Sequence, residues 1–163
     1  MPKKYLVFVI VLGLAVVWFI WIINAKAKEN QLRLSQLTDD TNVTVVASYT
    51  CGCCKLYAEY LKQQGFEVNL QTVSLEETKT YKDDNLVPLS LRSCHTSRIG
   101  DYVVEGHVPI EAIEKLLTEN PDIAGIGMAG MPSGSPGMPG PKDPFIINII
   151  TKDGNDGGLF IEL

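Results

Sequence analysis

Three of the four cysteines in the chain lie within four residues, in the sequence Cys51-Gly52-Cys53-Cys54. Cys51 and Cys54 have the spacing of a redox disulfide. All three sulfurs could instead bind a soft metal ion or a small cluster, because Gly52 lets the backbone turn so that neighbouring thiols converge. Thiolate ligands select Cu(I), zinc or iron–sulfur chemistry.

The third sulfur favours a metal site over a dithiol enzyme. A dithiol oxidoreductase needs two sulfurs, and a third one beside them invites scrambling. Structural zinc sites usually combine two separated pairs of ligands, whereas the fourth cysteine, Cys94, is isolated. The pattern therefore favours Cu(I), with zinc as the alternative ion. Thiol–disulfide exchange by Cys51 and Cys54 is the alternative function.

Other soft donors occur further along the chain. Cys94 adjoins His95, and His107 is the second of two histidines. Each of these residues also has an ordinary explanation: Cys94 as a buried structural thiol, His95 as a solvated side chain and His107 as a strand-end residue. Because His95 adjoins the only cysteine outside the cluster, it is the stronger histidine candidate. All methionines other than the initiator lie in one segment: Met128, Met131 and Met138. They could shield the site, pass copper onward or simply pack on a core.

Alternation and helical spacing predict the elements that position these residues. A buried strand leads into Cys51, and a helix follows it, which is a thioredoxin-like arrangement. Val87-Pro88 is the candidate for a cis proline facing the cysteines. Strands are expected at 43–49, 66–73, 101–107, 145–151 and 158–163, and helices at 55–64, 74–84 and 109–117. This order predicts an α/β fold, a thioredoxin-like sandwich that ends in a C-terminal β-hairpin.

The segment 121–144 holds six glycines and six prolines. A floppy low-complexity linker is one interpretation of such a composition. The chain must return from this segment to the same core, however, because an apolar hairpin follows it. We therefore expect an ordered, functional loop rich in glycine, proline and methionine.

The amino terminus predicts export. Residues 5–23 carry no charge, and Lys3 and Lys4 precede them. A helix of this length spans about 28 Å, close to the hydrocarbon thickness of a bilayer. We expect residues 1–28 to be a signal anchor forming one N-terminal transmembrane helix, with cleavage at residues 25–27 as the alternative. Residues 29–42 would be a tether, and 43–163 the metal-binding domain outside the cytoplasm.

Length and charge limit the other possibilities. The chain has 163 residues, which suits a single main domain. It carries 14 basic and 19 acidic residues, for a net charge of −5, and four of the basic residues lie in the first 28. The remainder is therefore markedly acidic, which argues against nucleic acid as a partner.

Four strings of the sequence resemble an exported bacterial family, the CopG-type copper-resistance proteins. They are Thr50-Cys51-Gly52-Cys53-Cys54, Ser93-Cys94-His95-Thr96, Glu105-Gly106-His107-Val108-Pro109 and Gly130-Met131-Pro132-Ser133-Gly134-Ser135-Pro136-Gly137-Met138. Two departures are Tyr57, where we expect tryptophan, and an amino terminus that is more anchor-like than a simple leader.

The resemblance implies a thioredoxin-like fold and a location in the periplasm, either anchored in the inner membrane or free after cleavage. It also implies that the four cysteines and a nearby histidine bind Cu(I), as a multinuclear cluster, in copper resistance. Copper redox activity and contacts with periplasmic copper-export proteins are further expectations. The candidate metal ligands are Cys51, Cys53, Cys54, Cys94, His95, His107, Met128, Met131 and Met138.

Overall fold

The computed structural model describes residues 12–26, 28 and 42–163, which fall into two units described separately. Residues 12–26 are helical, and most of their large apolar side chains are exposed. No helix in the described part of the chain is long and apolar enough to cross a membrane. The first part of the predicted signal anchor, 1–11, and the tether up to residue 41 lie outside the described residues.

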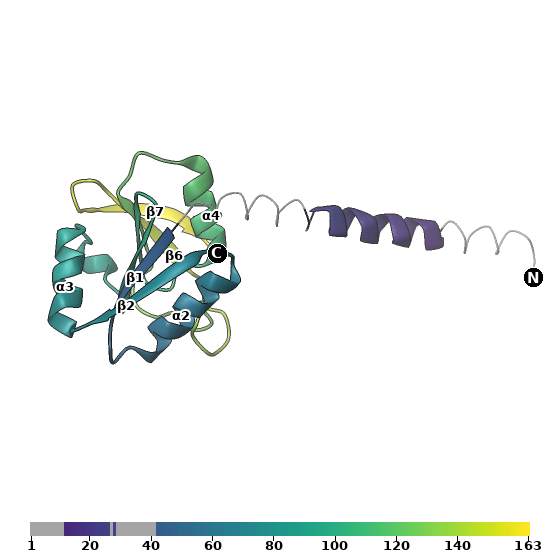
Figure 1. Ribbon diagram of the computed structural model, residues 1–163. Helices are drawn as coiled ribbons and strands as arrows, with labels where there is room; N and C mark the ends of the chain where they lie inside the picture. Colours follow the sequence, from purple (N-terminus) through teal and green to yellow (C-terminus); the bar gives the residue numbers. More distant parts are fainter. Residues whose placement is uncertain (1–11, 27, 29–41) are drawn as a thin grey trace, which may run out of the picture. The chain divides into compact units, whose positions relative to one another are not determined.

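The unit from residue 42 onward is built on a mixed seven-stranded sheet with the strand order β2-β1-β3-β4-β5-β6-β7. The predicted α/β fold and the C-terminal hairpin of β6 and β7 are confirmed (Figure 1). The strands are β1 (Asn42–Ser48), β2 (Glu67–Val73), β3 (His95–Ile99), β4 (Tyr102–Glu105), β5 (Gly125–Gly127), β6 (Ile146–Ile150) and β7 (Asp156–Glu162). The helices are α2 (Gly52–Gln63), α3 (Leu75–Asp84), the short 3-10 helix η1 (Leu89–Leu91) and α4 (Ile110–Glu119).

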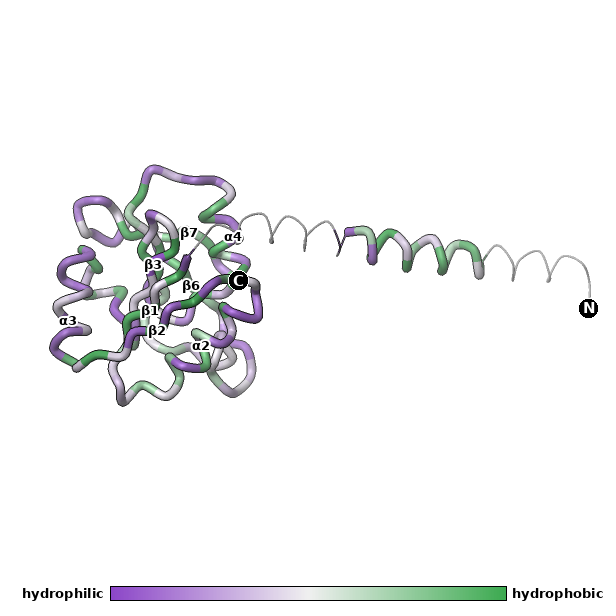
Figure 2. Tube along the Cα trace, viewed as in Figure 1, coloured by the Kyte–Doolittle hydropathy of each residue, from purple (hydrophilic) through white to green (hydrophobic). Residues whose placement is uncertain are grey.

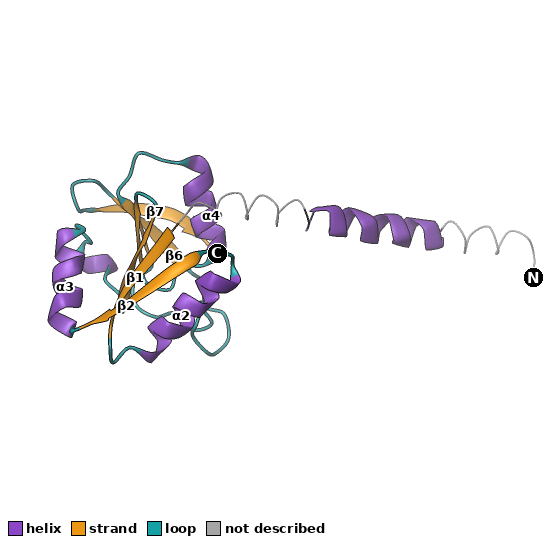
Figure 3. Ribbon diagram, in the orientation of Figure 1, coloured by secondary structure: helices purple, strands orange, loops and turns teal. Residues whose placement is uncertain are grey.

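Helices lie on both sides of the sheet (Figure 3). The larger core cluster includes Tyr57 and Leu61 of α2, Ile113 and Leu116 of α4, and Val104 of β4. Val103 points to the opposite side, because successive side chains of a strand alternate, and joins a smaller cluster with Val87 and Leu91. The sheet is therefore packed on both faces.

Local sequence signals explain where the helices begin and end. Ser74 caps α3: its hydroxyl accepts a hydrogen bond from the Glu77 amide at 3.2 Å, and the Glu77 carboxylate accepts one from the Ser74 amide at 2.8 Å. Pro109 stands just before α4, and Asn120 ends that helix in the left-handed conformation. Helix α3 is hydrophilic along most of its length (Figure 2), although Lys82 near its end is buried.

Three sequence expectations need correction. No strand is expected between residues 73 and 101, but His95 begins β3, which lies inside the sheet between β1 and β4. The Gly/Pro-rich segment contributes β5, whose Gly125 packs so closely on Val103 that a Cβ atom would collide with its carbonyl. The expected cis proline is absent: no cis peptide bond occurs in the described residues, and Pro88 precedes η1 instead.

Candidate metal centre

The loop after β1 delivers the first group of sulfur atoms. Cys51 stands just before α2, and its sulfur forms a disulfide with Cys54, with Cα atoms 5.5 Å apart. Cys53 is a free thiol, 3.5 Å from the Cys51 sulfur. All three sulfurs lie within 4.8 Å of one another. Position at a helix N-terminus favours thiolates, so reduction of the disulfide creates a compact three-sulfur donor group.

A second donor group forms around Cys53 from three separate parts of the chain. Its members are the sulfurs of Cys53 and Cys94 and a ring nitrogen of His107, again within 4.8 Å of one another. The sheet brings them together because Ala47 pairs with His95, and Thr96 pairs with Glu105. The end of β1, the start of β3 and the end of β4 therefore lie side by side at the same end of the sheet.

His107 has the geometry of a metal ligand. Its ring is buried, and its Nδ1 lies 2.7 Å from the carbonyl oxygen of Pro136. If Nδ1 donates to this carbonyl, Nε2 keeps its lone pair, an arrangement that orients metal-binding histidines. Nε2 has no hydrogen-bond partner among the described residues. Burial lowers the pKa of His107, against an opposing effect of the Pro136 carbonyl, so the imidazole is neutral at pH 7.

His95 contacts the ring of His107 and belongs to neither donor group. It is fully buried, 4.6 Å from the Tyr57 ring and 4.8 Å from the His107 ring, measured between centroids. Sequence reasoning ranked His95 first because of its neighbour Cys94. His95 is the first residue of β3 and packs against Tyr57, however, and the fold brings His107 to the sulfurs instead.

The three methionines are separated by the fold. Met131 lies over the thiols: its sulfur is 2.9 Å from that of Cys94 and 4.0 Å from that of Cys53. Met128 is buried in the core. Met138 lines a groove beside Leu56 and Tyr60 of α2. Met131 alone is brought to the cysteines.

Gly106 allows the segments to approach. Its φ is +81°, a conformation that suits glycine, and an added Cβ would lie 2.6 Å from the Met128 carbonyl oxygen and 2.9 Å from Ser93 Cβ. On the open side of Cys94, a pocket of about 510 Å³ extends between α3 and η1, lined in part by Leu75 and Leu89. The site is therefore tightly packed around Gly106 and accessible from the pocket beside Cys94.

Protonation of the Cys94 thiol would oppose metal binding at this candidate site. Burial raises the pKa of the Cys94 thiol, and the neighbouring Cys53 raises it further. In the metal-free, reduced protein this thiol keeps its proton at neutral pH. A metal ion must displace that proton to bind, so acid weakens binding.

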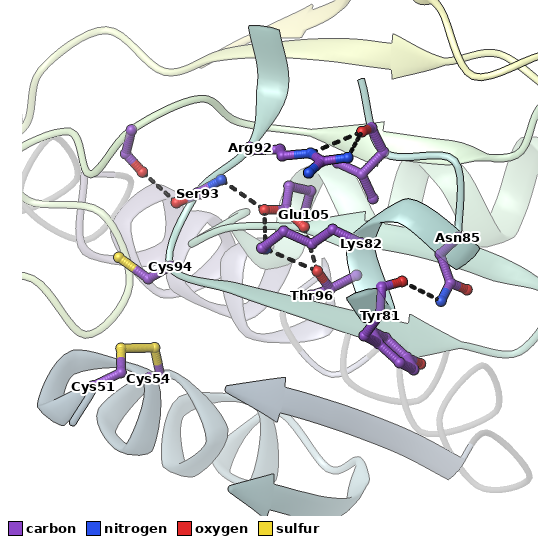
Figure 4. A network of polar contacts seen from close by, with 12 residues as sticks. Cys51, Cys54, Tyr81, Lys82, Asn85, Arg92, Ser93, Cys94, Thr96 and Glu105 are labelled. Carbon is purple, nitrogen blue, oxygen red and sulfur yellow. Dashed lines mark hydrogen bonds and ion pairs between the residues drawn. A yellow bond between two sulfur atoms is a disulfide. The ribbon is translucent and has the colours of Figure 1, made fainter. Parts of the chain in front are cut away.

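A network that sequence reasoning missed lies next to Cys94 (Figure 4). The Lys82 ammonium and the Glu105 carboxylate form a buried ion pair, 2.5 Å between Nζ and Oε1. Glu105 is part of one of the four sequence strings that resemble the CopG family, but the sequence assigns it no role. Lys82 had no signal at all, because it lies in a short polar helix whose sequence suggests a solvated surface.

Acid is expected to destabilise the metal-free protein through His95. Burial lowers the pKa of His95 well below its usual value, and the nearby His107 and Lys82 lower it further. Below about pH 6.5 the unfolded chain binds a proton that folded His95 does not, so stability falls as pH falls. His95 alone contributes a slope of up to about 1.4 kcal/mol per pH unit.

Urea unfolding of the metal-free protein between pH 7 and 5.5 measures this slope. His95→Phe keeps a ring beside Tyr57 and should have the shallower slope. Equal slopes in the two proteins would show that folded His95 takes up a proton as readily as the unfolded chain does.

Comparison with known proteins places this geometry in a wider context. A family model described as a protein of unknown function, DUF411, matches residues 91–138, which include Cys94, His107 and Met131. A solved structure titled "Copper resistance protein copG- Form 1" is 35% identical, with a TM-score of 0.68, over 75% of this chain and 96% of that one. The chain belongs to the CopG copper-resistance family.

A second CopG structure, "Form 2", is also 35% identical, with a TM-score of 0.67, over 76% of this chain and 98% of that one. No curated protein matches the chain. The resemblance to the CopG family that the four sequence strings predicted is thus confirmed.

Proposed function

We propose that the protein binds Cu(I) in the periplasm, through a thiolate cluster of a thioredoxin-like domain, and contributes to copper resistance. The observation that carries the proposal is His107: one of its ring nitrogens lies within 4.8 Å of the sulfurs of Cys53 and Cys94, and its Nε2 has no hydrogen-bond partner among the described residues. A buried ring nitrogen without a hydrogen bond is costly unless a ligand satisfies it. Thiolates, imidazole and a thioether together form a soft donor set of the kind that Cu(I) prefers.

Cys53 belongs to both donor groups, which supports a multinuclear site. In this proposal Cys51 and Cys54 complete one side of the cluster after reduction of their disulfide. Cys94 and His107 complete the other, and Met131 covers it. Copper is the cargo, and the names of the two solved relatives agree with this role.

Export is proposed from the sequence. Residues 5–23 are uncharged and follow two lysines, as in a segment that directs a chain out of the cytoplasm. In an oxidising compartment the Cys51–Cys54 disulfide would be stable until a reductant reaches it. Copper loading would then depend on the supply of thiol reductants.

An anaerobic titration of the reduced full-length protein with Cu(I), against a chromogenic Cu(I) chelator, tests the proposal. We expect more than one Cu(I) per chain, bound more tightly than by the chelator. Zinc offered in place of Cu(I) should bind more weakly, because the donor groups lack two separated cysteine pairs.

Thiol–disulfide exchange is the second candidate, since a disulfide does span Cys51 and Cys54 at the start of α2. Reduction of insulin by the protein, without Cu(I) binding that withstands the chelator, would replace the copper proposal with this one.

Met131→Leu is expected to weaken Cu(I) binding about tenfold, the scale of losing a supporting interaction at a metal site. Leucine keeps the volume but has no sulfur to offer. Met138→Leu is the matched control, because Met138 lies beside α2 and away from the thiols. Competition titration of both variants gives the measurement. Equal affinities would mean that Met131 only shields the site.

A further inference from the structure

One buried carboxylate connects the segments that carry the second donor group. Glu105 has no exposed surface, and its Oε1 accepts hydrogen bonds from the Lys82 ammonium at 2.5 Å and the Ser93 amide at 2.6 Å. Its Oε2 accepts one from the Thr96 hydroxyl at 2.5 Å. Lys82 also donates to the Thr96 oxygen at 2.9 Å. Figure 4 shows these four side chains next to Cys94.

The partners of Glu105 bracket a metal-ligand candidate. Ser93 precedes Cys94, and Thr96 follows it by two residues, so the carboxylate holds the chain on both sides of this cysteine. Glu105 itself lies two residues before His107. The Ser93 hydroxyl donates to the carbonyl of Gly130 at 2.5 Å, which extends the connection to the residue before Met131.

Stability alone does not account for a buried ion pair at this position. Removing two charges from water costs about as much as their attraction returns, and an apolar pair of the same shape is often as stable or more so. An apolar pair would, however, leave the part-buried Ser93 amide without its carboxylate acceptor. The carboxylate supplies that acceptor, and the Lys82 ammonium compensates its charge.

We propose that Glu105, with its charge compensated by Lys82, is a positioning residue that fixes the backbone at Ser93 and so holds the Cys94 sulfur ready for Cu(I). This inference rests on the proposed function, because it concerns the geometry of the same donor group. Glu105 acts through Cys94 and does not touch the metal.

Two double variants with equal charge separate this role from simple charge pairing. Lys82→Met with Glu105→Gln removes both charges but keeps an amide oxygen that can accept from the Ser93 amide. Lys82→Met with Glu105→Leu removes the acceptor as well. We expect the glutamine variant to bind Cu(I) as the wild type does, and the leucine variant to bind about tenfold more weakly.

A double-mutant cycle with Cys94→Ser distinguishes positioning from a general effect on the fold. If Glu105 acts through Cys94, the tenfold difference between the glutamine and leucine variants should disappear once Cys94 is serine. A difference that persists in the Cys94→Ser background would overturn the proposal. So would equal Cu(I) affinities of the two double variants in the wild-type background.

The controls keep each outcome interpretable. Circular dichroism and thermal melting establish that each variant folds. If the leucine variant does not fold, Thr96→Val takes its place, because it removes one hydrogen bond to Glu105 and keeps the ion pair. It should weaken Cu(I) binding several-fold, and only when Cys94 is present. Absence of Cu(I) binding by the wild type and the glutamine variant alike would instead refute the proposed function.

Discussion

Cys53→Ser is expected to lower the Cu(I) affinity of the reduced protein by about 100-fold, a loss of roughly 2.7 kcal/mol of binding free energy. Cys53 is the sulfur common to both donor groups, so its loss leaves two donors in each. Cys51 and Cys54 are unchanged in this variant, so they keep the ability to form their disulfide on oxidation. Competition titration should therefore show weaker binding and fewer copper ions per chain, with any dithiol chemistry retained.

Gly52→Ala is the matched control for this change, because the structure corrects the expectation that Gly52 turns the backbone: it is the first residue of α2 and does not have a positive φ. Gly52 lies beside Cys53 in the first turn of α2, and a Cβ added there meets no atom within 4 Å. Its Cu(I) affinity should equal that of the wild type. If Cys53→Ser also binds Cu(I) like the wild type, the two donor groups do not form a shared cluster.

Lys82→Met alone is expected to destabilise the metal-free protein by about 3–5 kcal/mol at pH 7, because it leaves the Glu105 carboxylate buried without its counter-charge. Urea unfolding of the wild type and the variant at pH 7 measures this difference in the free energy of unfolding.

Lys79→Met gives the comparison within the same helix. Lys79 is exposed and lies one turn before Lys82, so its replacement should change the free energy of unfolding by less than about 0.5 kcal/mol. Adding Glu105→Gln to Lys82→Met should recover most of the lost stability. A loss below about 1 kcal/mol for Lys82→Met would mean that water reaches the Glu105 carboxylate.

Sequence patterns predicted the elements in which apolar residues alternate or recur at helical spacing. Strands β1 and β2, helices α2 and α4, and the hairpin of β6 and β7 have such patterns. Strand β3 was missed because its sequence, His-Thr-Ser-Arg-Ile, lacks an apolar face. It lies within the sheet between β1 and β4, where Thr96 is buried against Lys82 and Glu105, partners that only the tertiary structure supplies. Strand β5 is short and glycine-flanked, so it carries almost no signal of its own.

The four cysteines of the candidate site were predictable, but which histidine and which methionine lie beside them was not. Choosing His107 over His95 requires knowing how the chain turns after β4 ends at Glu105 and brings His107 to the cysteines. Choosing Met131 over Met128 and Met138 requires the path of a loop whose turns depend on contacts such as that between the Ser133 amide and the Asp143 carboxylate, at 3.1 Å. Lys82 could not be found because nothing in a polar helix marks the residue that will be buried.

The scattered origin of the second donor group has a consequence for timing. Cys53, Cys94 and His107 come from three distant stretches, which meet only when β1, β3 and β4 have paired. Such non-local contacts form late, because loop closure must precede them. An unfolded chain presents only the local thiols near Cys51. The complete site therefore captures the metal only after folding. Each bound ion then stabilises the folded state relative to the unfolded chain by mass action.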